Sequence, residues 1–234
     1  MCAAFVQILL TAALSRFTLF TMEETRDRIL ACACEIYLED GFEGFSMRRL
    51  ARAVGVTAPA LYRHYESKES VLGAVVGEGH KVLGQYLYRT LAGPTPQERM
   101  HRAGEAFLDF ALDHPRYFQM MYAFTEFLGL EEMPEELREE TCAISRFWDD
   151  RVRESIEAGL LRDDDPKGIS LALWAHGYGL ISLYLRGLLE LDEDSFRAVY
   201  DDAFRRLFVG IASDAVVTEA RATSLRETRG FVSS

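Results

Sequence analysis

The fold of this chain is decided by residues 46–68, which read SMRRLARAVGVTAPALYRHYESK. Apolar residues recur at helical spacing on both sides of Gly55, and glycine is free to adopt the positive φ that a tight turn between helices requires. The stretch holds five Lys and Arg residues against one acid, Glu66, so it carries +4, whereas the whole chain of 234 residues carries −11. Positive charge gathered in one helical stretch of an acidic protein indicates that this stretch binds a polyanion.

The sequence as a whole predicts an all-α chain of about nine helices. No segment alternates polar and apolar residues over the length of a strand, and apolar residues recur every three or four positions instead. Thr57, Thr95 and Asp192 precede such segments and have side chains that can cap the free amides of a first helical turn. We expect helices over approximately residues 23–39, 46–53, 57–64, 68–90, 96–114, 116–129, 135–159, 166–189 and 193–212.

The first three of these helices have the proportions of a helix-turn-helix module. In such a module one helix crosses the DNA backbone and the next enters the major groove. The groove favours small or hydrogen-bonding side chains near the start of the inserted helix, whereas Leu61 and Tyr65 should point back to the core. The residues expected to face DNA are Arg48, Arg49, Thr57, Ala58, Pro59, Tyr62, Arg63, His64 and Lys68, the last as a phosphate contact at a helix start.

The run from Gly41 to Val76 resembles the N-terminal domain of TetR-family transcriptional regulators. The matching elements are Gly41-Phe42, Arg49-Leu50-Ala51, Ala53-Val54-Gly55-Val56, Leu61-Tyr62-Arg63-His64-Tyr65 and Ser67-Lys68-Glu69. The resemblance implies that Ser46, Arg48, Thr57, Pro59, Tyr62, His64 and Lys68 match positions that commonly touch DNA. One departure is that Ala58 and Ala60 offer no hydrogen bonds, so base recognition would depend on Thr57, Arg48 and methyl contacts. A later segment, Trp174-Ala175-His176-Gly177, looks like the Trp-His-Gly signature of one subgroup, in altered order.

The resemblance also implies an architecture and a way of working. An N-terminal helix-turn-helix domain would be followed by a C-terminal helical domain for ligand binding and dimerisation. The homodimer would bind double-stranded DNA at a near-palindromic operator, usually as a repressor that a small-molecule effector releases. We assign residues 22–68 to the first domain and residues 69–214 to the second.

The two ends of the chain are expected to lie outside these domains. Residues 1–21 are apolar and lack the basic start of a signal peptide, and Met22 begins a more ordinary sequence, which favours a mis-assigned start or an added arm. An alternative is a membrane-associated regulator anchored by residues 3–14, although that run is too short to span a bilayer as a helix. Residues 215–234 form a polar tail.

Aromatic residues in the C-terminal part are candidates for the lining of an effector pocket. Aromatics at helical spacing also serve as ordinary core, and His176 fits a core or interface position. The effector is expected to be a small apolar or aromatic molecule. The candidate ligand-binding residues are Phe107, Phe118, Tyr122, Phe147, Trp148, Trp174 and Tyr178.

A stripe of small residues on the helix predicted over 166–189 favours close approach of another helix. The following helix adds a wide apolar face, and two copies of the pair would form a four-helix interface with two-fold symmetry. Close packing within one subunit is the alternative. The candidate interface residues are Ala172, Ala175, Gly179, Ser182, Phe196, Tyr200 and Leu207.

The sequence argues against catalysis and against metal or cofactor chemistry. It contains no Gly-rich phosphate loop, no HExxH and no nucleophile elbow. Cys32 and Cys34 are two residues apart in a helical stretch and would point away from each other, and four cysteines are too few for a disulfide framework. We therefore expect a cytoplasmic DNA-binding regulator without enzymatic activity. A further alternative is a helical ligand-binding or interaction protein whose helix-turn-helix is vestigial.

Overall fold

The computed structural model describes residues 24–128 and 135–216, and within these ranges the secondary structure is helical. The β-type pairing found there is one isolated bridge between Leu161 and Ala212. The prediction of an all-α fold is thereby confirmed. The predicted extension over residues 1–21 and nearly all of the tail over residues 215–234 lie outside the described residues.

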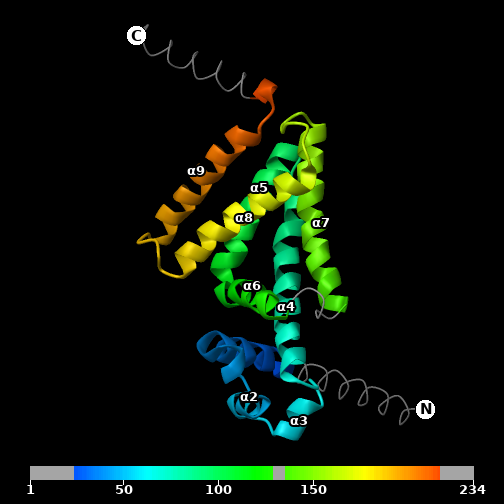
Figure 1. The fold of residues 1–234 in the computed structure, drawn as a ribbon, viewed down its shortest axis with the longest axis vertical. Coiled ribbons are helices and arrows are strands. Elements are labelled where there is room, and N and C mark those ends of the chain that lie inside the picture. The colour runs from blue at the N-terminus through cyan, green and yellow to red at the C-terminus, as the bar shows by residue number, and fades with distance from the viewer. Residues whose placement is uncertain (1–23, 129–134, 217–234) are drawn as a thin grey trace, which may run out of the picture. The chain divides into compact units, whose positions relative to one another are not determined.

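Each predicted helix is present, with ends that differ by a few residues (Figure 1). The first helix covers residues 24–44, and the short helix that was predicted over 57–64 ends earlier, at Tyr62. The helix predicted over 166–189 ends at Leu185, because Gly187 takes φ +68° and turns the chain. The later helices are α2 (Met47–Val54), α3 (Ala58–Tyr62), α4 (Lys68–Arg89), a 3-10 turn η1 (Thr90–Ala92), α5 (Pro96–Asp113), α6 (Pro115–Leu128), α7 (Glu135–Glu157), α8 (Pro166–Leu185) and α9 (Glu193–Ile211).

The helix starts follow the predicted capping chemistry. Thr95 Oγ1 accepts a hydrogen bond from the Glu98 amide at 3.2 Å, directly before Pro96 in the first turn of α5. At the start of α9, the Asp192 carboxylate accepts from the Ser195 amide at 2.9 Å. Hydrogen bonding to Ser195, first to its side chain and then to its amide, lowers the pKa of Asp192 below its ordinary value, because it stabilises the charged carboxylate.

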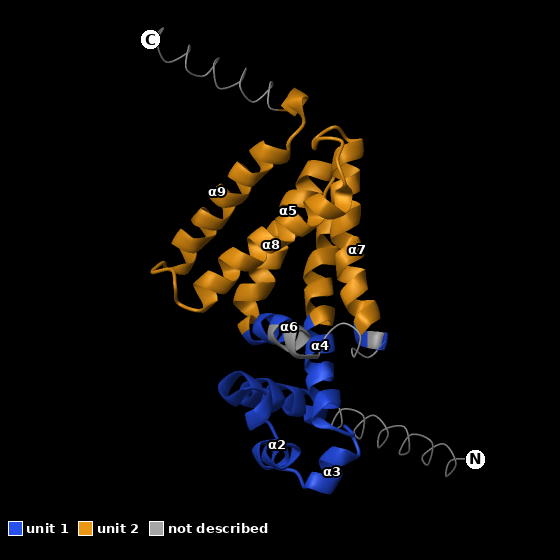
Figure 2. Ribbon diagram, viewed as in Figure 1, with its two compact units in different colours: residues 1–79, 116–137 blue, residues 80–115, 138–234 orange. Residues whose placement is uncertain are grey.

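The chain divides into two compact units (Figure 2). Of the described residues, the first unit contains those up to Gly79 together with Arg116–Leu137, and the second contains His80–Pro115 and those from Arg138 onward. The division falls within the continuous helix α4, between Gly79 and His80.

The first unit is built on the apolar faces that the sequence pattern indicated. Ile29 and Ala33 of the first helix, Leu50 of α2 and Leu61 of α3 are completely buried or nearly so. Burying apolar side chains from three helices around one centre holds these helices together, at about 25 cal/mol per Å² of apolar surface removed from water. The remaining inward positions of the first two helices, also buried, are Ile36, Tyr37, Met47, Ala51 and Val54.

The second unit has a core formed by α5, α7, α8 and α9. Val152 and Leu173 are its buried centre, and Phe204 and Phe208 of α9 pack against it. Arg99 donates hydrogen bonds to Glu154 and thereby joins the start of α5 to α7. These contacts fix the four helices that surround the cavity described below.

Helix α8 is apolar on two sides. Ile169, Leu173 and Ile181 are buried on one side, whereas Leu171 and Leu183 are exposed on the other. By length and composition alone, α8 is the one helix among the described residues that could cross a membrane, and 28% of its most apolar window is buried.

Candidate nucleic-acid interface and effector cavity

The turn between α2 and α3 has the geometry of a helix-turn-helix. Gly55 has φ +79°, as its place in the sequence predicted, and the amide of Val56 donates to the carbonyl of Ala51 at 2.9 Å. Arg28 of the first helix donates to the carbonyl of Val54 at 2.8 Å and so satisfies a free carbonyl at the end of α2. The role of Arg28 was not predicted, because its contact lies 26 positions away on another helix and local sequence patterns do not show such contacts.

Helix α3 exposes the side that was expected to face DNA. Thr57 Oγ1 caps the helix by accepting from the Ala60 amide at 3.3 Å, and Pro59 occupies the first turn, where no amide donor is needed. Leu61 and Tyr65 are buried as predicted. The residues that remain on the solvent side are Thr57, Pro59, Tyr62, Arg63 and His64, with Ala58 half-buried.

The exposed arginines of α2 differ in how they are held. Arg49 pairs with Asp40 and also lies 3.7 Å from Glu39, so its guanidinium is already engaged. Arg48 and Arg52 are exposed, and no described residue forms an ion pair with either. Ser46 caps α2 by accepting from the Arg49 amide at 3.3 Å. Arg48 and Arg52 are therefore the α2 arginines whose charge is available to a phosphate.

Lys68 has a structural partner that the sequence did not indicate. Its Nζ lies 3.5 Å from the centroid of the Phe42 ring and donates to the Phe42 carbonyl at 3.4 Å. The same ammonium stands at the first residue of α4, which was the reason for predicting a phosphate contact. Lys68 thus connects the start of α4 to the end of the first helix.

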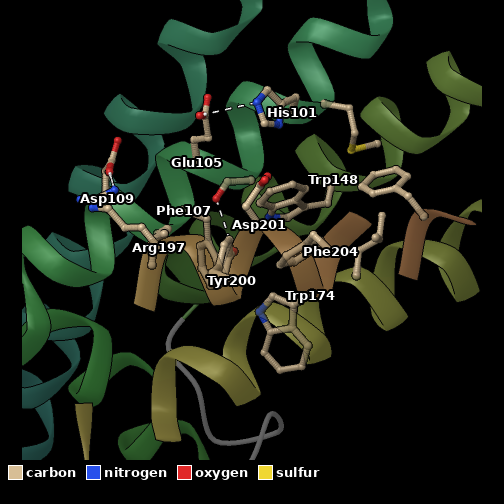
Figure 3. A pocket seen from close by; sticks show the side chains of 15 residues that line it. His101, Glu105, Phe107, Asp109, Trp148, Trp174, Arg197, Tyr200, Asp201 and Phe204 are labelled. Carbon is tan, nitrogen blue, oxygen red and sulfur yellow. Dashed lines mark hydrogen bonds and ion pairs between the residues drawn. The ribbon is translucent and has the colours of Figure 1, made fainter. Parts of the chain in front are cut away.

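The second unit contains a cavity of about 330 Å³ between α5, α7, α8 and α9 (Figure 3). Three of the predicted pocket residues line it: Phe107, Trp148 and Trp174. Its other lining residues are Met100, His101, Gly104, Glu105, Leu108, Asp109, Leu173, Arg197, Tyr200, Asp201, Phe204 and Phe208. A cavity of this size with mostly apolar and aromatic walls is typical of a small-molecule site.

Four predicted pocket residues do not line this cavity. Phe147 is buried with its ring against those of Tyr88 and Trp148, and Tyr178 stacks on Trp174 with ring centroids 5.4 Å apart. Phe118 and Tyr122 belong to α6 in the first unit, where their rings meet edge to face at 5.1 Å. These rings pack as ordinary core or as support for the lining, which the helical spacing of aromatics does not distinguish from a cavity wall.

The charged residues that line the cavity were not predicted from the sequence. Arg197 donates to Asp109 at 2.6 Å across 88 positions of sequence, and this hydrogen bond is the main reason that the pKa of Arg197 is raised. Glu105 lies 3.6 Å from His101, its neighbour one helical turn away. In the sequence such residues are indistinguishable from the solvated faces of α5 and α9.

The predicted dimer residues fall into two groups. Ala172 and Ala175 are exposed and Gly179 and Ser182 are half-buried, all on the exposed side of α8, and Leu207 of α9 is half-buried. Phe196 and Tyr200, by contrast, are buried inside the chain. Phe196 stacks on Tyr184 with centroids 4.0 Å apart, and Tyr200 lines the cavity. Neither of these two can therefore form the surface of an interface.

In the part of the chain that the structure describes, no group of three or more His, Cys, Asp or Glu residues could hold a metal ion. His176 of α8, expected in a core or interface position, is half-buried and meets the ring of Phe204 edge to face at 5.1 Å.

Two family models match the chain over both units. The model described as bacterial regulatory proteins of the tetR family matches residues 29–75, which include the helix-turn-helix. The model described as the tetracyclin repressor-like C-terminal domain matches residues 100–207, which include every residue that lines the cavity except Phe208. The chain belongs to the TetR family.

The chain is also similar to individual proteins, among them a curated regulator and two solved structures. The chain is 28% identical over 101 residues to the HTH-type transcriptional activator FasR of Mycolicibacterium smegmatis, a match that covers 43% of this chain and 46% of FasR. It thus spans about half the length of this curated relative. Among solved structures, it is similar to the TetR family regulator PfmR of Thermus thermophilus, with 26% identity and a TM-score of 0.62, covering 76% of this chain and 97% of PfmR. A protein of unknown function from Rhodococcus is also similar, with 26% identity and a TM-score of 0.65 over 81% of this chain and 96% of that one.

Proposed function

We propose that this TetR-family protein is a DNA-binding transcriptional regulator that acts in the cytoplasm as a ligand-responsive repressor. The observation that carries the proposal is the exposed side of α3 beside the two available arginines of α2. Thr57, Pro59 and Tyr62 present small or hydrogen-bonding groups, and Arg48 and Arg52 supply charge on the neighbouring helix. A major groove accepts one helix of this kind and phosphates flank it.

The exposed side of α8 supports a homodimer. Leu171 and Leu183 leave 62% and 42% of their surface in water, and Ala172 and Ala175 lie on the same side of the helix. Val199 of α9 adds another exposed apolar side chain, at 41%. A second copy related by two-fold symmetry would bury this surface, which accounts for an apolar α8 better than a membrane does. A two-fold dimer places one α3 on each half of a near-palindromic operator, about 34 Å apart.

The cavity of the second unit supports response to an effector. A ligand can release DNA only if it binds one conformation of the protein more tightly than another. Moving the protein from mostly bound to mostly released requires a preference of several kcal/mol, which burial of an aromatic molecule in this cavity can supply.

The test is selection of operator sequences from random duplex DNA by the purified protein, at two salt concentrations. We expect a near-palindromic motif and affinity that falls steeply with salt, because phosphate contacts release counterions. Thr57→Val should change the preferred sequence, whereas Thr57→Ser keeps the capping hydroxyl and should retain it. The control is Lys167→Gln, which changes an exposed lysine at the start of α8, outside the proposed DNA-binding surface.

The two alternative functions predict different results. A vestigial helix-turn-helix predicts no enrichment at either salt concentration. A membrane-associated regulator predicts sedimentation with lipid vesicles, and its predicted anchor over residues 3–14 lies outside the described residues. The dimer is tested by sedimentation equilibrium, in which Ala175→Glu should yield monomer because it buries a charge in the apolar contact.

A further inference from the structure

The charges around the cavity are unequal, and this inequality bears on the chemistry of the effector. Three carboxylates line the cavity, those of Glu105, Asp109 and Asp201, against one guanidinium, that of Arg197. Arg197 already pairs with two carboxylates, since it donates to Asp109 at 2.6 Å and to Glu193 at 3.0 Å. In this cavity, an anionic ligand would therefore meet no lining arginine or lysine that lacks a carboxylate partner.

Glu105 and Asp201 are held much less firmly than Asp109. Asp201 lies 3.7 Å from Arg205, and both side chains are more than half exposed. Glu105 lies 3.6 Å from His101, which is positive only when protonated. Exposed pairs at such distances contribute little, so both carboxylates can turn to a bound cation.

The walls beside these carboxylates are rings (Figure 3). Trp148, Phe107 and Phe204 come from three different helices and surround the same space. The faces of aromatic rings attract cations as well as other rings, most strongly for tryptophan. Rings and carboxylates together form a site for a flat positively charged group.

A second cavity of about 590 Å³ adjoins the first and has a different lining. Five residues line both cavities and form the shared wall: Met100, His101, Asp201, Phe204 and Phe208. The walls of the second cavity that the first does not share are mainly aliphatic: Leu160, Leu161, Val209, Ala212 and Val216. Its polar lining outside the shared wall is Gln97, Ser155 and Arg205, and Arg205 already pairs with Asp201 and Asp202. An apolar chain that leaves the first cavity past Phe204 and Phe208 would enter an aliphatic space.

From these two linings we infer that the effector is an amphipathic cation. Its flat cationic group lies among the rings of the first cavity, beside Glu105 and Asp201, and its apolar chain extends into the second cavity. The inference rests on the proposed function in one respect, which is that the bound ligand is the effector of a regulator. Binding itself is measured without DNA.

The probes are N-alkylpyridinium ions from butyl to decyl, used below the concentration at which they form micelles. The chain holds two tryptophans, Trp148 and Trp174, and both line the first cavity, so quenching of intrinsic fluorescence reports occupancy directly. Alkanols and alkyl carboxylates of equal chain length are the neutral and anionic comparisons. We expect decylpyridinium to bind at least about tenfold more tightly than decanoate, and affinity to rise about threefold to fourfold for each methylene buried.

Two variants test the carboxylates and a third is their matched control. Glu105→Gln and Asp201→Asn should each weaken pyridinium binding about threefold to fivefold and leave decanol binding unchanged. Asp194→Asn removes an exposed carboxylate from the same helix as Asp201, α9. Asp194 lines neither cavity, so this change should alter nothing. Thermal melts of all three variants establish that they are folded.

The inference is overturned if decanoate binds as tightly as decylpyridinium, or if the double variant E105Q/D201N keeps its preference for the cation. Release of DNA from the selected operator is measured separately. Pyridinium binding without DNA release would support this ligand class and refute the ligand-responsive repressor. DNA release by an alkyl carboxylate, without pyridinium binding, would support the ligand-responsive repressor and refute the cationic ligand class.

Discussion

Replacing Lys68 by methionine should destabilise the first unit by about 1 kcal/mol. The Lys68 ammonium lies 3.5 Å from the Phe42 ring centroid, and a partly exposed cation–π contact contributes about 0.5 to 1 kcal/mol. Its hydrogen bond to the Phe42 carbonyl is long, at 3.4 Å, and adds about 0.5 kcal/mol at most. Methionine keeps the length of the stem and removes the charge, so these two contributions are what the substitution loses.

The assay is urea unfolding followed by circular dichroism, with Phe42→Leu and the double variant completing a double-mutant cycle. If the contact is real, the double variant is less destabilised than the two single variants together, by about 0.5 to 1 kcal/mol. Lys167→Met, which removes an exposed charge from α8, is the control and should be neutral within about 0.5 kcal/mol. Additive effects of the two single variants would show that Lys68 does not hold Phe42.

The same variant separates stability from DNA binding. Loss of one phosphate contact lowers the slope of log affinity against log salt by about 0.9, at every DNA sequence. An unchanged slope together with the loss of stability would mean that Lys68 serves the fold alone, and the expectation of a phosphate contact would be wrong.

Three further predictions concern other parts of the chain. Burial raises the pKa of Cys34 to about 12, so iodoacetamide at pH 8 should alkylate the exposed Cys142 and leave Cys34 intact in the folded protein, as mass spectrometry of peptides would show. Hydrogen bonds from Arg99 lower the pKa of Glu154, so the stability that this pair provides is complete above the ordinary glutamate pKa of about 4.3 and is lost as the pH falls below it. Urea titrations from pH 7 to pH 3 should therefore show Glu154→Gln converging on the wild type in acid. Gly55→Ala should lower the free energy of unfolding by about 1 to 2 kcal/mol, because alanine is strained at φ +79°, and an equal or higher urea midpoint would contradict this.

The features of the fold that the sequence predicted well are those set by local chemistry. Thr57, Thr95 and Asp192 cap the helices they precede, because a capping side chain reaches only amides two or three positions ahead. Gly55 turns the chain because it alone has the required φ without strain. Leu61 is buried because the apolar face of a helix has no other low-energy place.

The predictions that were wrong concern what covers an apolar helix face, a helix of the same chain or a second copy of the protein. Phe196 and Tyr200 were assigned to a dimer interface, yet they are buried within their own chain. Periodicity shows that a face is covered but does not show whether the covering helix belongs to the same molecule or to a copy. Assignment of the face to a partner therefore required the positions of α8 and α9.

The sequence predicted a cavity with aromatic walls in the C-terminal part, but only some of the residues that line it. Trp148 and Trp174 line it as expected, whereas Phe147, one residue before Trp148, packs against Tyr88 and the Trp148 ring and does not line it. Glu105 and Arg197 were overlooked because a charged residue on a helix is normally solvated, and their common location depends on how α5 and α9 cross.

Helix α4 has glycine at four of its positions, Gly73, Gly77, Gly79 and Gly84, which together cost roughly 4 kcal/mol of helix propensity relative to alanine. Its helical state therefore depends on the burial of side chains such as Leu72 and Leu83. The division between the two units follows directly after two of these glycines, at Gly79. The amides of this turn should be among the first in the helix to exchange with solvent. A movement of one unit that costs more free energy than opening this turn would open the turn, and would not be passed to the other unit along α4.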